Sequence, residues 1–188
     1  MNRWCLCRSM LRLFVSVPLP PVTIPGLGTV RDEGSGGAHL TLKFLGNVQD
    51  PGIGPVGLAL EAGLRGAGAF PISLQELDAF PSRERPRVLY AKVAIGRPEL
   101  AGLAERVERA LTGLGFPRED RPWVGHLTVK RLRPGPPVPE VLDLLGRHQG
   151  TRFLVTVVRR VELVSSVLTA KGAVHTPLVA FPLAPLPG

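Results

Sequence analysis

The strongest constraint on the fold is a five-residue phrase that occurs twice, as HLTLK starting at His39 and as HLTVK starting at His126. Each copy alternates polar and apolar residues, which is the pattern of a half-buried β-strand. Side chains two apart on a strand point to the same face. We therefore predict that His39 and Thr41 share one strand face, that His126 and Thr128 share another, and that the apolar residues between them enter the core.

The two copies start 87 residues apart, nearly half of the 188-residue chain. This spacing predicts two pseudo-symmetric lobes, each contributing one histidine strand to a shared cleft. Residues 18–37 are rich in proline and glycine and are predicted to be a loop. Apolar periodicity predicts strands over residues 11–17, 38–45, 70–80, 87–94, 125–132, 151–156, 159–168 and 175–183, and helices over 53–64, 98–115 and 139–145. Because this order is not a regular βαβ array, we predict an α+β fold with antiparallel sheets and packed helices.

The net charge of +8 indicates an anionic partner, with nucleic acid first and a membrane surface second. The basic residues are 19 arginines and only 4 lysines beside 22 glycines and 20 prolines, a mixture that a GC-rich genome or adaptation to heat also produces. Charge is therefore weak support by itself. No apolar run is long enough to span a membrane, so we expect no membrane partner.

The two cysteines, Cys5 and Cys7, are too close in sequence for a favourable disulfide, and no other cysteine could pair with them. We therefore expect a reducing, cytoplasmic environment. Arginines interrupt the apolar character of the first residues, which argues against a signal peptide. Residues 1–9 are interpreted as an extension before a start at Met10, and residues 10–188 as a single domain of two intertwined lobes.

The repeated phrases carry residues suited to phosphoester chemistry. A histidine pair can hold one neutral base and one charged acid near neutral pH, which in-line attack on a phosphodiester requires. The hydroxyls of Thr41 and Thr128 can donate hydrogen bonds to phosphoryl oxygens. Lys43 and Lys130 are predicted on the same strand faces, adding charge near the cleft mouth. Arg131 is a further candidate for substrate binding, although it should point to the opposite face unless the strand twists or bulges.

Other kinds of site find less support. No carboxylate accompanies the two phrases, and His-x-Thr is not a metal-ligand pattern, so we predict no metal. No phosphate-binding loop is present, so no nucleotide cofactor is predicted. We expect His148 at the surface or at a helix end, and we assign His175 no role.

The paired His-hydrophobic-Thr-hydrophobic (HxTx) phrases resemble the signature of the two-histidine (2H) phosphoesterase superfamily. Within it, the chain is similar to the RNA 2′,3′-cyclic phosphodiesterase family, also called 2′-5′ RNA ligase or LigT-like. The resemblance includes the opening strand at residues 11–15, the longer phrase HLTLKFLG, Phe80-Pro81, residues 85–89 and residues 171–178. It covers about residues 10–183.

The resemblance implies a bilobal LigT-like fold of two antiparallel sheets with flanking helices around a central groove. It implies metal-independent hydrolysis of RNA 2′,3′-cyclic phosphates to 2′-phosphomonoesters, with reversible 2′-5′ RNA ligation as a minor activity. In this family the first histidine, His39 here, donates a proton to the leaving 3′-oxygen, and the second, His126, accepts a proton from water. Thr41 and Thr128 would bind the phosphate oxygens. We expect a monomer that acts on RNA ends.

One segment departs from the family pattern. Family members usually place a helix between the first strand and the first motif, where this chain has the short proline- and glycine-rich residues 18–37. This departure keeps open the alternative of an RNA-binding module without turnover. A cyclic phosphodiesterase that acts on small nucleotides also stays open, because the same chemistry would serve it. The pseudo-symmetry of the motifs also leaves open which histidine is the acid.

Overall fold

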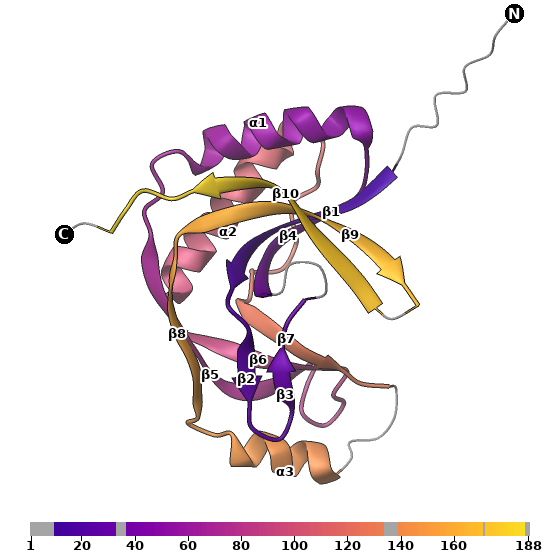
Figure 1. Cartoon of the computed structure of the whole chain (residues 1–188), viewed down its shortest axis with the longest axis vertical. Coiled ribbons are helices and arrows are strands. Elements are labelled where there is room, and N and C mark those ends of the chain that lie inside the picture. The colour runs from indigo at the N-terminus through magenta and orange to yellow at the C-terminus, as the bar shows by residue number, and fades with distance from the viewer. Residues whose placement is uncertain (1–9, 33–36, 134–138, 171, 187–188) are drawn as a thin grey trace, which may run out of the picture.

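The computed structural model describes residues 10–32, 37–133, 139–170 and 172–186 (Figure 1). The predicted extension at residues 1–9 lies outside the described residues. Two four-stranded antiparallel sheets form the centre of the molecule, as predicted. The first has the order β10 (Gly172–Pro182), β9 (Arg160–Thr169), β1 (Met10–Leu19), β4 (Ala38–Gln49). The second has the order β7 (His126–Arg131), β6 (Val88–Ile95), β5 (Phe70–Phe80), β8 (Arg152–Val158).

The chain passes from the second sheet to the first through a single residue, Arg159. β8 ends at Val158 and β9 begins at Arg160, yet these consecutive strands belong to different sheets. The strands predicted over residues 151–156 and 159–168 are both present. The first sheet therefore combines strands from both ends of the described chain, while the second is built entirely from its middle.

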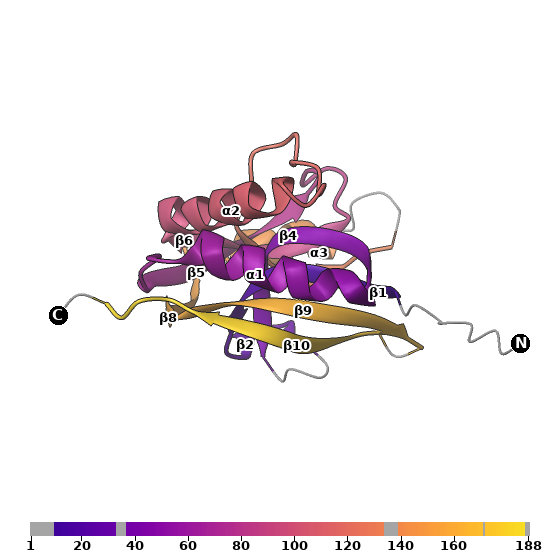
Figure 2. The same ribbon diagram turned by 90° about the horizontal axis from the view of Figure 1, so that it is seen from above.

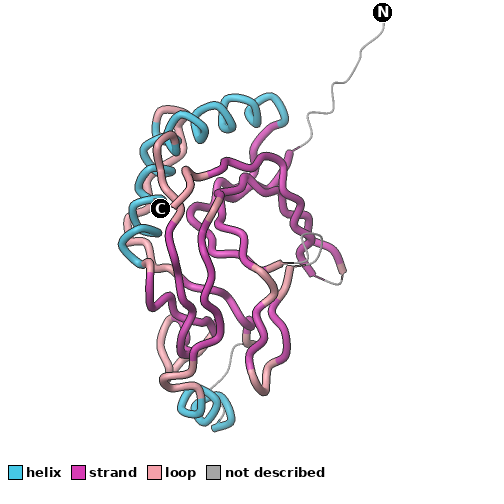
Figure 3. Tube along the Cα trace, turned by 60° about the vertical axis from the view of Figure 1, so that its left-hand side comes forward, coloured by secondary structure: helices cyan, strands magenta, loops and turns pink. Residues whose placement is uncertain are grey.

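The helices lie at the outside of the molecule, with the strands between and beside them (Figure 3). Two of them, α1 (Ile53–Leu64) and α2 (Arg97–Thr112), pack against each other, and α1 is seen between α2 and the β9–β10 ribbon in Figure 2. A third helix, α3 (Pro139–Arg147), lies at the opposite end, and a short 3-10 helix, η1 (Asp50–Gly52), precedes α1. The helix predicted over residues 98–115 ends at Thr112, and Leu114, beyond that end, is 43% exposed.

Two local predictions need correction. Residues 18–37 are not a simple loop, since they contain a small hairpin of β2 (Val22–Ile24) and β3 (Gly28–Val30), whose residues Val22 and Ile24 are buried. The strand predicted to stop before Gly46 continues as β4 to Gln49, because Gly46 adopts a positive φ of 71° and bends the strand without ending it.

None of the helices among the described residues combines the length and the apolar character needed to cross a membrane.

Candidate active site

Both copies of the repeated phrase face one groove. His39 lies on β4, at the edge of the first sheet, and His126 lies on β7, at the edge of the second. Both histidines line a groove of about 560 Å³ together with Thr41 and Thr128. The two strands therefore meet at one groove, as the spacing of the two phrases predicts.

Each copy contains a β-bulge at the same position, directly after the threonine. The extra residue is Leu42 in β4 and Val129 in β7, where the pairing with the neighbouring strand slips by one. A slip of one residue exchanges the faces of a strand for every side chain beyond it. The fifth residue of each phrase therefore leaves the groove face, and the sixth, Phe44 or Arg131, lines the groove.

The bulges explain why the predicted positions of Lys43 and Lys130 beside the groove are wrong. Lys43 is buried, and its Nζ donates hydrogen bonds to both carboxylate oxygens of Glu108 at 2.8 and 2.9 Å and to the carbonyl oxygen of Pro117 at 2.7 Å. Lys130 is exposed and is not among the residues that line the groove. The cation that this motif does bring to the groove is Arg131, which the sequence pattern placed on the other face unless the strand bulged.

His39 is held by a carboxylate. Its Nδ1 lies 2.5 Å from Oδ2 of Asp32, and its ring packs against Phe14 with centroids 5.0 Å apart. Burial disfavours the charged form of Asp32, but attraction to His175 and His39 outweighs burial and lowers the pKa of Asp32 to about 2. The carboxylate orients the His39 ring through Nδ1 and leaves Nε2 free of this contact.

Asp32 comes from the atypical segment before β4, seven residues ahead of the histidine. The two phrases contain no carboxylate, but the fold places one, that of Asp32, against the first histidine, so the expectation of a site without a carboxylate is wrong. In the sequence, nothing separates Asp32 from an ordinary loop aspartate, because its partner depends on how the hairpin folds back.

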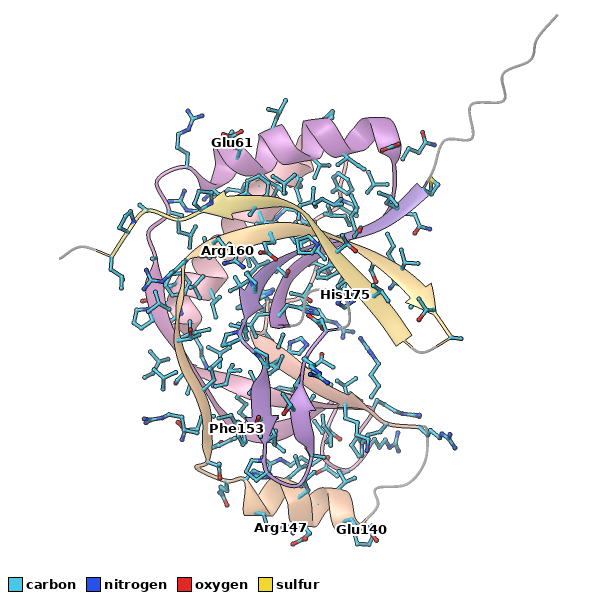
Figure 4. All side chains as sticks on the ribbon, viewed as in Figure 1. Glu61, Glu140, Arg147, Phe153, Arg160 and His175 are labelled. Carbon is cyan, nitrogen blue, oxygen red and sulfur yellow. The ribbon has the colours of Figure 1, made fainter. Side chains whose placement is uncertain are left out.

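His175 is a second residue of the site that sequence reasoning missed. It lies on β10, lines the groove, and places its Nδ1 3.4 Å from Oδ1 of Asp32. Its ring meets the rings of His39 and Phe14 edge-on, with centroids 5.1 Å away in each case. Figure 4 shows His175 near the centre of the molecule, far from Arg147 on α3.

His126 has a different environment. Its Nδ1 is 2.8 Å from the carbonyl oxygen of Val124, which accepts the Nδ1–H and leaves Nε2 with a lone pair. Phe80 and Tyr90 enclose the ring at centroid distances of 5.0 and 5.5 Å. Burial lowers the pKa of His126, opposed by the hydrogen bond to Val124 and assisted by the positive charges of Arg131 and His39. The lowered pKa favours the neutral form of the His126 ring.

The two motifs are tied together by Trp123, which precedes β7. Its Nε1 donates a hydrogen bond of 2.9 Å to the backbone carbonyl of Thr41. A side chain at Gly125 would approach the indole to 2.7 Å, so only glycine allows the ring to lie there. Trp123 also lines a hollow of about 660 Å³ that shares Thr41, Phe44 and His126 with the groove.

A family model described as the 2′-5′ RNA ligase superfamily matches residues 34–168. The chain belongs to this family. The family resemblance of the motifs is thereby confirmed, with the match covering both histidine phrases.

Relatives and solved structures agree with this assignment. An Aeropyrum pernix protein named RNA 2′,3′-cyclic phosphodiesterase is 34% identical over 80% of this chain and 82% of its own length. The crystal structure of a Thermus thermophilus protein, 26% identical, covers 92% of this chain and 97% of that one with a TM-score of 0.67. The structure of E. coli LigT complexed with 3′-AMP, 21% identical, covers 93% and 99% with a TM-score of 0.65 and shares the fold.

Proposed function

We propose that this protein is a monomeric, cytoplasmic enzyme that hydrolyses RNA 2′,3′-cyclic phosphate ends to 2′-phosphomonoesters without a metal ion. The observation that carries the proposal is the unequal pair of histidines in one groove, one held by a carboxylate and the other by a carbonyl oxygen. Relatives named RNA 2′,3′-cyclic phosphodiesterase support the choice of substrate.

The environments of the histidines favour His39 as the acid and His126 as the base. In this scheme His126 Nε2 takes a proton from water as the water oxygen attacks phosphorus. The bond from phosphorus to the 3′-oxygen breaks, and protonated His39 gives its Nε2 proton to that oxygen. The products are a 2′-phosphomonoester and a free 3′-hydroxyl. An RNA 5′-hydroxyl in place of water would form a 2′-5′ phosphodiester, which accounts for ligation.

The negative phosphoryl oxygens require donors, which the groove contains in Thr41, Thr128 and Arg131. The adjoining hollow, lined by Phe44, Phe80 and Trp123, offers aromatic rings on which a base can stack. A groove of this kind suits an RNA end better than a single small nucleotide, because the two hollows adjoin at His126.

The test is to incubate a short RNA ending in a 2′,3′-cyclic phosphate with the protein in EDTA and to determine the position of the product phosphate. A 2′-phosphate is expected. Salt-sensitive RNA binding without product would contradict the proposal and favour a binding module. Faster turnover of a cyclic mononucleotide than of the oligomer, with little dependence on salt, would instead assign the activity to small nucleotides.

Removing a threonine hydroxyl should slow the reaction. Thr41→Val and Thr128→Val preserve shape and the β-branched side chain, so we expect each to reduce kcat by roughly 10–1000-fold through lost stabilisation of the phosphoryl oxygens. Single-turnover kinetics with saturating enzyme would measure the effect. Thr23→Val, on the exposed face of the β2–β3 hairpin, is the matched control and should leave kcat unchanged. Full activity in both groove variants would exclude the assigned role.

The pH–rate profile should be bell-shaped. Activity should rise with pH as His126 loses its proton, and this limb should lie below the ordinary histidine range because the pKa of His126 is lowered. Activity should fall at higher pH once the acid of the pair no longer holds the proton that it must donate. Because apparent values belong to the pair, the limbs are assigned by mutation.

Arg131→Gln removes one of the charges that lower the pKa of His126, so it should move the acidic limb of kcat/KM to higher pH. The readout is the position of the limb, not its height, since Arg131 also lines the groove. Arg133→Gln, a nearby exposed arginine outside the groove lining, should leave the limb in place. An acidic limb that stays fixed in Arg131→Gln would contradict His126 as the base.

A further inference from the structure

Three metal-ligating groups from separate segments converge on one side of the groove. Asp32 precedes β4, His39 lies on β4 and His175 lies on β10. One carboxylate oxygen and one nitrogen from each ring all lie within 4.8 Å of one another. Asp32 contacts both imidazoles, at 2.5 Å from His39 Nδ1 and 3.4 Å from His175 Nδ1. Two imidazoles and a carboxylate are the ligand types that zinc and related divalent ions prefer.

His175 has an incomplete hydrogen-bond arrangement. Its Nδ1 is buried and makes no hydrogen bond, although Asp32 Oδ1 is only 3.4 Å away. Among the described residues, no other buried side-chain nitrogen or oxygen lacks a partner. Buried polar atoms are ordinarily paired, so this nitrogen is available to an ion. Its 3.4 Å separation from the carboxylate oxygen is close to the spacing of two ligands that share one zinc ion through bonds of roughly 2.0 Å.

The cluster can be reached by an ion and adjoins empty space that can hold one. Asp32, His39 and His175 line both the groove and a smaller cavity of about 110 Å³ behind it. This cavity also contains the buried residues Ser16 and Glu162, and Glu162 is paired with Arg160 at 2.7 Å. Because the three groups line the groove as well as the smaller cavity, an ion can reach them from the groove and keep a water ligand.

We propose that Asp32, His39 and His175 form a binding site for a divalent transition metal of the zinc class, and that its occupancy inhibits the enzyme. The metal binds Nδ1 of both histidines and a carboxylate oxygen of Asp32, and it displaces the proton shared between Asp32 and His39. The inhibition rests on the proposed function. A metal-bound imidazole cannot become the imidazolium that the acid role requires, because its remaining Nε2 proton belongs to a neutral ring.

Binding is tested without any activity measurement. Zinc is titrated calorimetrically into the full chain carrying Cys5→Ser and Cys7→Ser, which removes the two thiols as competing ligands. Cobalt(II) serves as a second probe, since its visible absorption strengthens when imidazole nitrogens replace water. One ion per chain is expected. Absence of binding in both titrations would overturn the proposal.

The ligands are tested by substitution. His175→Phe keeps a ring packed against Phe14 and His39 but removes the nitrogens, and Asp32→Asn removes the carboxylate charge; each should weaken zinc binding by at least the roughly 10–100-fold that losing an outer-shell partner costs. His148→Gln, a buried histidine bonded to the carbonyl of Pro25, is the matched control and should bind zinc as the parent does. Unchanged affinity in either folded ligand variant would overturn the site.

Inhibition is tested separately. Turnover of the cyclic phosphate should fall with added zinc and return with EDTA, and half-inhibition of His175→Phe should need at least tenfold more zinc, relative to its own metal-free rate. His126→Gln should bind zinc normally while losing turnover, so failure of the proposed reaction is distinguishable from failure of the metal site. Zinc that binds in a His175-dependent way without slowing turnover would overturn the inhibitory role.

Discussion

His39→Gln and His126→Gln should each reduce kcat/KM for an RNA 2′,3′-cyclic phosphate by at least roughly 10²–10⁴-fold, the contribution of a positioned acid or base. Glutamine occupies similar space but cannot carry the proton at neutral pH. Because the two histidines act in one step, the double variant should be little worse than either single variant. Initial rates with a 3′-terminal cyclic phosphate RNA, followed by separation of substrate from product, would measure these losses.

The matched control is His148→Gln. The sequence predicts His148 at the surface or a helix end; it does follow the end of α3, but it is buried, with its Nε2 bonded to the carbonyl of Pro25 at 2.9 Å. Glutamine can replace that hydrogen bond, and the residue does not line the groove. Turnover should therefore survive. A groove variant that kept near-parent activity would show that the two-histidine mechanism is wrong.

Lys43→Met should lower the free energy of unfolding by about 3–5 kcal/mol, because it leaves the charge of Glu108 buried without its partner. Pro117 also loses a hydrogen-bond donor. Methionine preserves the apolar stem, so the loss reports the charge more than the packing. Urea unfolding followed by circular dichroism would measure the change, with an unchanged m-value showing that the denatured state is not altered.

Two comparisons sharpen this prediction. Lys130→Met makes the same substitution at the equivalent position of the other copy, where the side chain is exposed, and should change stability by no more than about 0.5 kcal/mol. Lys43→Met combined with Glu108→Leu removes both buried charges and should recover most of the lost stability. Equal effects of the two lysine variants would contradict the different environments of the two copies.

The contrast between these lysines marks the limit of the sequence pattern. Period-two alternation places His39, Thr41, His126 and Thr128 correctly, because it needs only the local geometry of an extended strand. The alternation predicts the wrong face for the fifth residue of each phrase, because a β-bulge depends on how the neighbouring strand pairs. The alternation carries no signal for the slip that buries Lys43 and turns Arg131 into the groove.

The same reason explains the residues that were missed. Asp32 and His175 become part of the site only because the fold brings the segment before β4 and the strand β10 next to His39. Trp123 likewise joins the two lobes through a hydrogen bond to the backbone of Thr41, a partner 82 residues away. Such contacts are long-range and leave no periodicity in the chain.

The amino-acid sequence by itself determined most of the strands, the three α-helices, the antiparallel class, the pairing of the two lobes and the four repeated groove residues, because these follow from local periodicity and from a duplicated phrase. Only the tertiary structure decided which histidine is held by a carboxylate, which motif cation faces the groove and where a metal could bind. These depend on strand register and on chain segments that meet in space. The two histidines have nearly identical motifs but different neighbours: an ionised carboxylate beside His39, and burial with nearby positive charge that lowers the pKa of His126.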